Sequence, residues 1–388
     1  MLLLHKGVDA LDLSFPLTIG ADLSEEFEKM KACMAENRLD SATKFGSDYV
    51  MLVFPNGAKG GFAYRCRIGR DGHDWLFKKP GNGRDEWGAR VSCRAQDLAL
   101  HGVDGVRAEL DTQFGIFGLH YTPGIESLAR IDFAMDFLAP DLVLDPARFV
   151  MHGRSTRKTF RTHGNKPVES VEHGRSGRVT SVTIGRNPNR QVIVYDKREE
   201  IFGKPSGLPV IWNDRLEQAG YEPLNLRDAR VSRVWRVEVR FYKDYLKKQW
   251  QVTTFADLRA AMLPMLRDTV GSIRYTAPNG DSNRARWPDH RLWERVREEI
   301  ECDFMALASP VDPLTVSALS RAQQAEYLDR QIKGCVLNLA ALKGISQTGL
   351  DAFTGGYARI IARGFAADPE RTRKKMQAAR ARYGVAGE

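Results

Sequence analysis

The chain has few cysteines and no long hydrophobic run. Five of its 388 residues are cysteines, and no two of them form a C-x-x-C pair. Scattered cysteines in odd number indicate a reducing compartment and argue against a structural zinc site. No stretch is apolar over the ~20 residues that a membrane span needs, and the apolar start of the chain soon meets His5 and Lys6. The sequence therefore predicts a cytoplasmic protein without a signal peptide or membrane segment.

The sequence also has no internal repeat or low-complexity tract, and its basic residues outnumber its acidic residues. The formal net charge is +9. Most of the excess falls between Met151 and Arg198, where eleven basic residues face three acidic ones. A concentrated basic segment is typical of a protein that binds a phosphate backbone, so DNA is the expected partner.

The length suits two or three domains. We expect a mixed α/β domain over residues 1–125, a strand-rich domain over 126–245 and a helical region over 246–388. Within these regions the pattern indicates a strand over Leu11–Thr18 and helices over Ala95–His101 and Phe255–Arg267, and Thr254 with Asp257 predicts a capping arrangement at the start of the last helix. An antiparallel sheet that is apolar on one face needs helices behind that face, which leaves the other face open. The predicted fold class is therefore α+β, with helices backing one open sheet.

Three short segments place ionisable residues on one face of a strand whose other face is apolar. They are Arg130–Phe137 (RIDFAMDF), Gln191–Lys197 (QVIVYDK) and Val234–Phe241 (VWRVEVRF). A strand alternates its side chains with a period of two. The ionisable faces then carry Asp132 and Asp136 from the first segment, Tyr195 and Lys197 from the second, and Arg236, Glu238 and Arg240 from the third.

These residue types support phosphodiester cleavage. A tyrosine hydroxyl can attack phosphorus and keep the bond energy in a phosphotyrosine ester. A divalent ion held by carboxylates would stabilise the developing charge, and hard oxygen ligands favour Mg²⁺ or Mn²⁺. We expect Tyr195 to be the nucleophile and Lys197 to lower its pKa or pair with a phosphate oxygen. Asp132, Asp136 and Glu238 are the candidate metal ligands.

A structural explanation competes with each assignment. The acids and the neighbouring arginines can form cross-strand ion pairs on a solvated sheet face. Tyrosine in a strand is more often a packing aromatic than a nucleophile.

At these residues the chain resembles the replication initiation factor family, whose members start rolling-circle replication of plasmids and filamentous phages or nick conjugative elements. The resemblance lies in three motifs in order: Arg130–Phe137, the turn from Gly185 into the Tyr195 strand, and Trp235–Glu238 (WRVE). It covers about residues 129–242 and leaves the N-terminal third and the helical tail unmatched.

The resemblance implies a metal-dependent DNA nicking and strand-transfer enzyme that works through a phosphotyrosine. Tyr195 would join the 5′ phosphate of the nicked strand, and Asp132, Glu238 and Asp136 would surround the metal. Arg186 and Arg190, in the turn before the tyrosine strand, would clamp phosphate. Arg236 and Arg240 are further candidates for DNA contact.

Other functions remain open at this point. A relaxase that nicks the transfer origin of a conjugative element would use the same chemistry, and a DNA-binding regulator that no longer cuts would keep the sheet. A tyrosine recombinase is disfavoured because no H-x-x-R box precedes the tyrosine. A host helicase, a polymerase and a second copy of the chain are further candidate partners.

Overall fold

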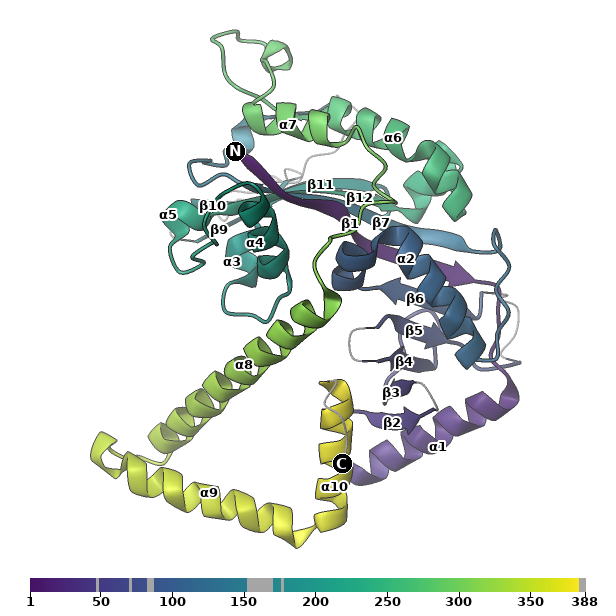
Figure 1. Ribbon diagram of the computed structural model, residues 1–388, viewed down its shortest axis with the longest axis vertical. Helices are drawn as coiled ribbons and strands as arrows, with labels where there is room; N and C mark the ends of the chain where they lie inside the picture. Colours follow the sequence, from purple (N-terminus) through teal and green to yellow (C-terminus); the bar gives the residue numbers. More distant parts are fainter. Residues whose placement is uncertain (47–48, 70–71, 82–86, 152–169, 176–177, 384–388) are drawn as a thin grey trace, which may run out of the picture.

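The computed structural model describes residues 1–46, 49–69, 72–81, 87–151, 170–175 and 178–383. One large antiparallel sheet forms its centre, and in the described ranges it has eleven strands in the order β2-β3-β4-β5-β6-β1-β7-β12-β11-β10-β9 (Figure 1). The strands of this sheet are β1 (Leu2–Phe15), β2 (Ala42–Phe45), β3 (Val50–Phe54), β4 (Tyr64–Ile68), β5 (Asp74–Phe77), β6 (Ala89–Cys93), β7 (Ser127–Leu138), β9 (Ser170–Arg175), β10 (Arg178–Gly185), β11 (Arg190–Asp196) and β12 (Val234–Tyr242). A small second sheet pairs β8 (Phe149–Met151) with β13 (Ile273–Tyr275).

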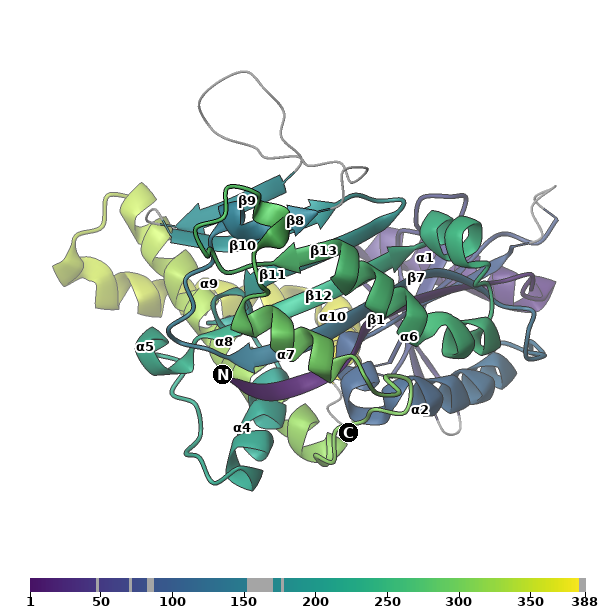
Figure 2. The ribbon, with the colours of Figure 1, turned by 90° about the horizontal axis from the view of Figure 1, so that it is seen from above.

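Helices lie on both sides of the central strands. Figures 1 and 2 show α6 and α7 above the sheet, with α3 and α4 below it and α2 beside β1 and β6. The α-helices are α1 (Ala21–Asn37), α2 (Ala95–Ile116), α3 (Lys197–Ile201), α4 (Leu208–Gln218), α5 (Ala229–Ser232), α6 (Phe255–Ser272), α7 (Arg291–Glu299), α8 (Pro313–Leu342), α9 (Leu350–Ala367) and α10 (Pro369–Arg382). Short 3₁₀ turns at Pro146–Arg148, Arg284–Arg286 and Gln347–Gly349 and a π-helical turn at Tyr245–Gln249 complete the list. The expected α+β class, antiparallel sheet and helical C-terminal region are confirmed, but the sheet face that was expected to be open is partly covered by α3 and α4.

The apolar face of the central strands forms the main core under α6 and α7. Phe133 of β7 packs edge-on against Phe241 of β12 and against Phe304, and all three are buried. The N-terminus of α6 is fixed by the capping box expected from the sequence. The Thr254 hydroxyl accepts a hydrogen bond from the Asp257 amide at 3.2 Å, and the Asp257 carboxylate accepts one from the Thr254 amide at 2.9 Å.

Strand β1 is much longer than the sequence predicts. The pattern indicated a strand over Leu11–Thr18, whereas β1 begins at Leu2 and runs between β6 and β7. Its pairing with β7 shifts register between Leu3 and His5 and again between Val8 and Ala10. Each irregularity reverses the alternation of inward and outward side chains, so the first ten residues carry no period of two.

Helix α2 contains a sharp break at Gly102. The sequence predicted a helix only over residues 95–101, but helical structure resumes after Gly102 and continues to Ile116. Gly102 has φ 65° and ψ 179°, a backbone conformation that favours glycine. A Cβ atom at this position would lie 2.6 Å from the carbonyl oxygen of Leu307, so the segment packed against the break also requires glycine.

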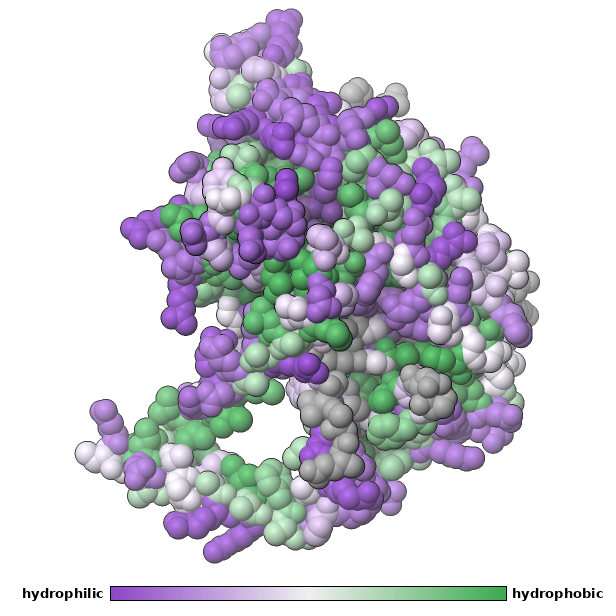
Figure 3. Space-filling model, viewed as in Figure 1, coloured by the Kyte–Doolittle hydropathy of each residue, from purple (hydrophilic) through white to green (hydrophobic). Residues whose placement is uncertain are grey.

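The C-terminal helices leave the sheet as an extended arm. Val316 near the start of α8 is buried against Ala99, Leu100 and Ile211, whereas α10 returns to contact β2 and β3 (Figure 1). Figure 3 shows an opening between this arm and the rest of the molecule, with hydrophobic surface along α8 and α9. Across the described residues, no helix has the length and apolar character to cross a membrane.

The predicted division into domains at residues 125 and 245 stays a prediction. The central sheet is continuous across residue 125, because β1 pairs along most of its length with β7.

Candidate active site on the acidic face of the sheet

Three adjacent strands bring the predicted residues to one face of the sheet, which we name the acidic face. It comprises the side chains of Asp132 and Asp136 in β7, Arg236, Glu238 and Arg240 in β12, and Tyr195 in β11. Asp136 lies opposite Arg236, Asp132 lies opposite Arg240, and Tyr195 lies opposite Arg236 on the other flank. The alternation in the three segments therefore gives the correct face for each residue.

Tyr195 forms the centre of a small polar cluster. Its hydroxyl donates a hydrogen bond to Glu238, with 3.0 Å between Oη and Oε2. The ammonium group of Lys197 lies 3.4 Å from the same hydroxyl and 5.5 Å from the ring centroid. Tyr195 is partly exposed, whereas Glu238 is only 1% exposed. A buried carboxylate thus accepts the hydrogen bond of the phenol, and part of the Tyr195 side chain remains exposed to solvent.

Lys197 reaches Tyr195 from a helix rather than from the expected strand position. Strand β11 ends at Asp196, whose carboxylate accepts a hydrogen bond from the Glu199 amide at 3.0 Å and caps α3. Lys197 is the first residue of α3 and also forms an ion pair with Glu200 at 2.5 Å. The capping aspartate is therefore what turns the chain and places the ammonium group beside the phenol.

The electrostatic environment keeps Tyr195 protonated at rest. Burial raises the pKa of the Tyr195 hydroxyl well above its ordinary value, and Glu238 adds to the increase, while Arg236 opposes it. The net change is opposite to the lowering that Lys197 was expected to cause. Nucleophilic attack from this hydroxyl would therefore need a group that accepts its proton.

Asp132 is held between two arginines. Arg130 donates from Nε to Oδ1 of Asp132 at 2.9 Å and forms a second bond to Oδ2. Arg240 Nε lies 3.4 Å from Asp132 Oδ2 and donates to Glu238 Oε1 at 2.5 Å. Burial raises the pKa of Asp132 to about 7, even though Arg130 acts to lower it. Arg240 thus links the Asp132 carboxylate to the Tyr195 cluster.

Asp136 belongs to a separate, fully buried group. Arg236 donates to both of its carboxylate oxygens, at 2.6 and 2.8 Å, and the Trp212 indole donates to Oδ2 at 2.9 Å. Arg236 also contacts Asp9 Oδ1 at 2.5 Å, and both Asp136 and Arg236 are 0% exposed. Burial alone would raise the pKa of Asp136, but Arg236 outweighs it and holds the pKa below its usual range. Sequence reasoning missed Trp212 and Asp9, because no local pattern links these distant positions to β7.

The expected metal ligands do not fit a divalent ion as they stand. Both oxygens of Asp136 are engaged by Arg236 and Trp212, and both oxygens of Asp132 are engaged by Arg130. Arg240 fills the space between Asp132 and Glu238, so a cation already bridges these two carboxylates. The contacts are those of the cross-strand ion pairs that the sequence also suggested. Binding of Mg²⁺ or Mn²⁺ at this face stays a prediction.

The two arginines of the turn before β11 have different surroundings. Arg186 is exposed. Arg190 instead donates to Tyr245, Thr269 and Ser272 at 2.8–3.0 Å and pairs with Asp268 at 2.5 Å, which ties β11 to α6. The fully buried Arg236 likewise has no access to a ligand outside the protein. We therefore keep Arg186 and the partly exposed Arg240 as candidate DNA contacts. Much of the basic segment expected to bind DNA falls at residues 152–169, outside the described residues.

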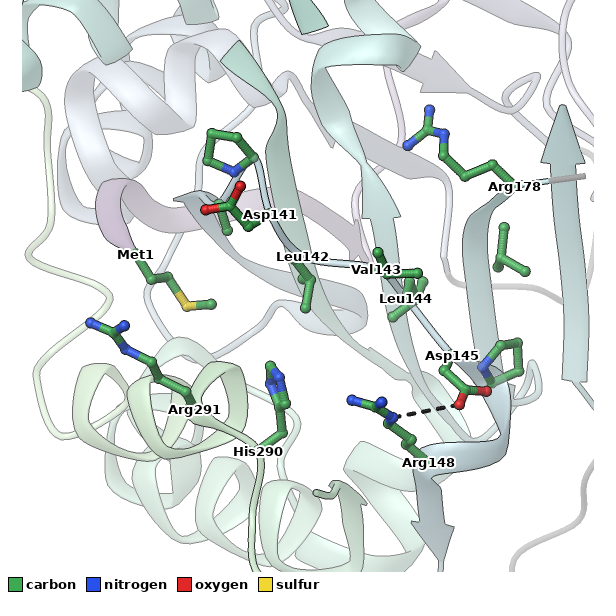
Figure 4. Close-up of a pocket in the computed structure, with 14 residues that line it drawn as sticks. Met1, Asp141, Leu142, Val143, Leu144, Asp145, Arg148, Arg178, His290 and Arg291 are labelled. Atoms are coloured by element: carbon green, nitrogen blue, oxygen red, sulfur yellow. Dashed lines mark ion pairs between the residues drawn. The ribbon is translucent and has the colours of Figure 1, made fainter. Parts of the chain in front are cut away.

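A cavity of about 740 Å³ lies away from the acidic face (Figure 4). It is bordered by Met1, by the loop after β7 and by His290 and Arg291 at the start of α7. Figure 4 shows Arg148 paired with Asp145 at its rim. Because the lining contains neither Tyr195 nor Glu238, this cavity does not serve the candidate active site.

Comparison with known proteins finds similarity only among solved structures. No family model and no curated protein matches the chain. Among solved structures, a rolling circle replication initiator protein from Geobacillus stearothermophilus is similar, with a TM-score of 0.40 and 15% sequence identity, over 79% of this chain and 99% of that chain. At this TM-score and identity the likeness assigns neither an activity nor a residue role to the present chain.

Proposed function

We propose that the protein is a DNA nicking and strand-transfer enzyme that initiates rolling-circle replication of a plasmid or phage. The observation that carries the proposal is the hydrogen bond from the Tyr195 hydroxyl to the buried Glu238 carboxylate, with Lys197 beside the same oxygen. A tyrosine that attacks a phosphodiester acts as the nucleophile and needs two further groups, a proton acceptor and a cation.

In the proposed reaction the phenolic oxygen of Tyr195 attacks phosphorus while its proton passes to Glu238. The bond from phosphorus to the 3′ oxygen breaks, so the 5′ phosphate becomes a phosphotyrosine ester. The 3′ oxygen takes a proton from solvent water, and Glu238 later returns its proton to solvent. Lys197 and the partly exposed Arg240 are placed to stabilise charge on the phosphate oxygens. Rejoining reverses these steps.

No step is assigned to a metal ion, because Arg240 occupies the space between Asp132 and Glu238. If Mg²⁺ or Mn²⁺ binds there, Asp132 and Glu238 would hold it and it would act as a Lewis acid on the phosphate.

The decisive experiment is a gel assay for protein attached covalently to a labelled single-stranded oligonucleotide that carries the cognate origin. The wild-type protein should give an adduct, and Tyr195→Phe should give none while binding the oligonucleotide with unchanged affinity. Tyr121→Phe is a matched control, because Tyr121 is a partly buried tyrosine outside the acidic face whose hydroxyl also donates to a buried carboxylate, that of Glu126 at 2.9 Å. Equal adduct yield from wild type and Tyr195→Phe would remove Tyr195 from the reaction.

Two other functions predict different results in the same assay. A relaxase for conjugative transfer would form the same adduct on a transfer origin, so the recognised sequence separates it from a replication initiator. A regulator that binds DNA without cutting would give salt-sensitive binding and no adduct. The cluster at Tyr195 favours an enzyme, because a hydroxyl hydrogen-bonded to a buried carboxylate is not needed for DNA binding.

A further inference from the structure

A second group of ionisable side chains lies in the N-terminal part of the chain, away from the acidic face. It joins His73, at the start of β5, to Asp97 and Glu109 of α2. One potential ligand atom from each residue lies within 4.8 Å of the others. We name these three residues the His73 cluster.

The break in α2 is what brings the two acids together. Asp97 and Glu109 are twelve positions apart, which corresponds to about 18 Å along a straight helix. The reversal of the backbone at Gly102 folds the two halves of the helix so that both carboxylates face the same imidazole. The backbone conformation of Gly102, which glycine adopts most readily, therefore allows Asp97 and Glu109 to approach His73 together.

The His73 imidazole has an unusual environment. The side chain is 0% exposed, and neither ring nitrogen has a hydrogen-bond partner. Nδ1 lies 3.4 Å from Asp97 Oδ2, and Nε2 lies 3.7 Å from Glu109 Oε2. A neutral imidazole has one N–H, so at least one ring nitrogen carries only a lone pair while a carboxylate oxygen lies 3.4 or 3.7 Å away. Such a contact is repulsive unless a positive charge lies between the two atoms.

Two positive charges can fill that position, a proton or a metal ion. The separation of Nδ1 from Oδ2 is close to the edge of a tetrahedron with zinc–ligand bonds of about 2.1 Å, which is about 3.4 Å. The geometry thus matches two ligands of one ion.

The surrounding residues orient the third ligand. Gln113 donates to Glu109 Oε1 at 2.6 Å and accepts a hydrogen bond from the Trp75 indole at 2.5 Å. This leaves Oε2 of Glu109 3.7 Å from Nε2, so Glu109 must shift for one ion to bind it together with Nδ1 and Asp97. Ligating carboxylates are typically held by such outer contacts. Glu109 is 38% exposed at its side chain, so it can adjust its position and water can complete the coordination.

We propose that His73, Asp97 and Glu109 bind one divalent transition-metal ion of the zinc type. A ligand set of one imidazole and two carboxylates suits Zn²⁺ better than Mg²⁺ or Ca²⁺, which prefer oxygen alone. The ion would tie β5 to both halves of α2 and so stabilise this end of the sheet. The site contains no cysteine, which is why cysteine spacing in the sequence gave no sign of it. This proposal is independent of the proposed DNA chemistry.

The test measures zinc in the full-length protein. Purified protein is stripped with a chelator, loaded with Zn²⁺, dialysed and analysed by mass spectrometry, and its affinity is measured by competition with a coloured chelator. Wild type should retain one ion, and Zn²⁺ should raise its unfolding temperature. Glu109→Gln should lower the affinity by more than the about 10- to 100-fold typical of an outer-shell change, and should reduce the thermal shift. Because Glu109 is partly exposed, this substitution should leave the fold intact.

Two control variants make the result specific. Asp111→Asn changes an exposed acid of the same helix and should retain zinc as the wild type does. Glu238→Gln changes the acidic face and should also retain zinc. Equal retention by Glu109→Gln and Asp111→Asn, loss of zinc in Glu238→Gln, or no retained ion in the wild type would each overturn the proposal.

Discussion

Lys197 opens a helix, and its ammonium group lies 3.4 Å from the hydroxyl of Tyr195, which belongs to the preceding strand. Glu238 lies on the other side of that hydroxyl, at 3.0 Å. The phenolic hydroxyl thus contacts both a buried carboxylate and an ammonium group, and four predictions follow from this site and its surroundings.

Glu238→Gln should slow formation of the covalent adduct by about 100-fold or more, because a neutral amide cannot take the phenolic proton. Single-turnover kinetics on a labelled oligonucleotide measure the rate. Glu217→Gln, an exposed acid of α4, is the matched control and should react at the wild-type rate. An unchanged rate in Glu238→Gln would exclude this carboxylate as the proton acceptor.

Arg236→Met should lower the free energy of unfolding by about 3–5 kcal/mol, because it leaves the buried Asp136 carboxylate without its cation. Urea unfolding followed by circular dichroism provides the value. Arg230→Met removes a comparable arginine from a surface pair with Asp228 and should not change the stability measurably. Similar losses in the two variants would show that burial of the Asp136 pair is not what makes it important.

Arg186→Ala and Arg190→Ala should separate DNA contact from structure. Loss of the exposed Arg186 should weaken DNA binding and reduce the slope of log affinity against log salt by about 0.7–0.9, the value for one phosphate contact. Loss of Arg190 should instead lower stability, because it removes contacts to α6. Fluorescence anisotropy across a salt series measures the first effect and urea unfolding the second. A salt slope that changes only in Arg190→Ala would reverse the assignment.

Asp132 should make stability depend on pH. Its pKa is about 7 in the folded protein and about 4 in an unfolded chain, so the folded state binds the extra proton. This contribution is complete below about pH 4 and is lost as pH rises through about 7. Unfolding free energies at pH 5 and pH 8, measured with EDTA present, should therefore differ more in the wild type than in Asp132→Asn. An equal pH dependence in both proteins would contradict the raised pKa.

Much of the candidate site follows from local alternation in the sequence. Period-two patterning in β7 and β12 placed Asp132 and Glu238 on one face of the sheet. The same rule placed Tyr195 of β11 on that face. The hydrogen-bond and ion-pair partners of these residues could not be predicted from the sequence. In the sequence, Arg236 looks like a polar residue on the solvated face of a strand. It is buried only because Trp212 of α4 and Asp9 of β1 pack around it and Asp136.

Long-range contacts also explain the missed features outside the site. The second helix was predicted to end at His101. In the structure the chain changes direction at Gly102 and the helix continues beyond it. Glycine is necessary there because of its backbone conformation and because Leu307, about two hundred residues later, packs closely against it. Arg190 is similar, since only the packing of α6 distinguishes it from a surface arginine.

The central position of β1 limits where the protein can be truncated. A fragment that ends near residue 125 would keep the pairing of β1 with β6 but lose β7, which covers the other edge of a fourteen-residue strand. Unpaired strand edges of this length recruit other chains. Expression of the first third alone should therefore yield aggregates, and working truncations should instead remove residues from the C-terminal end.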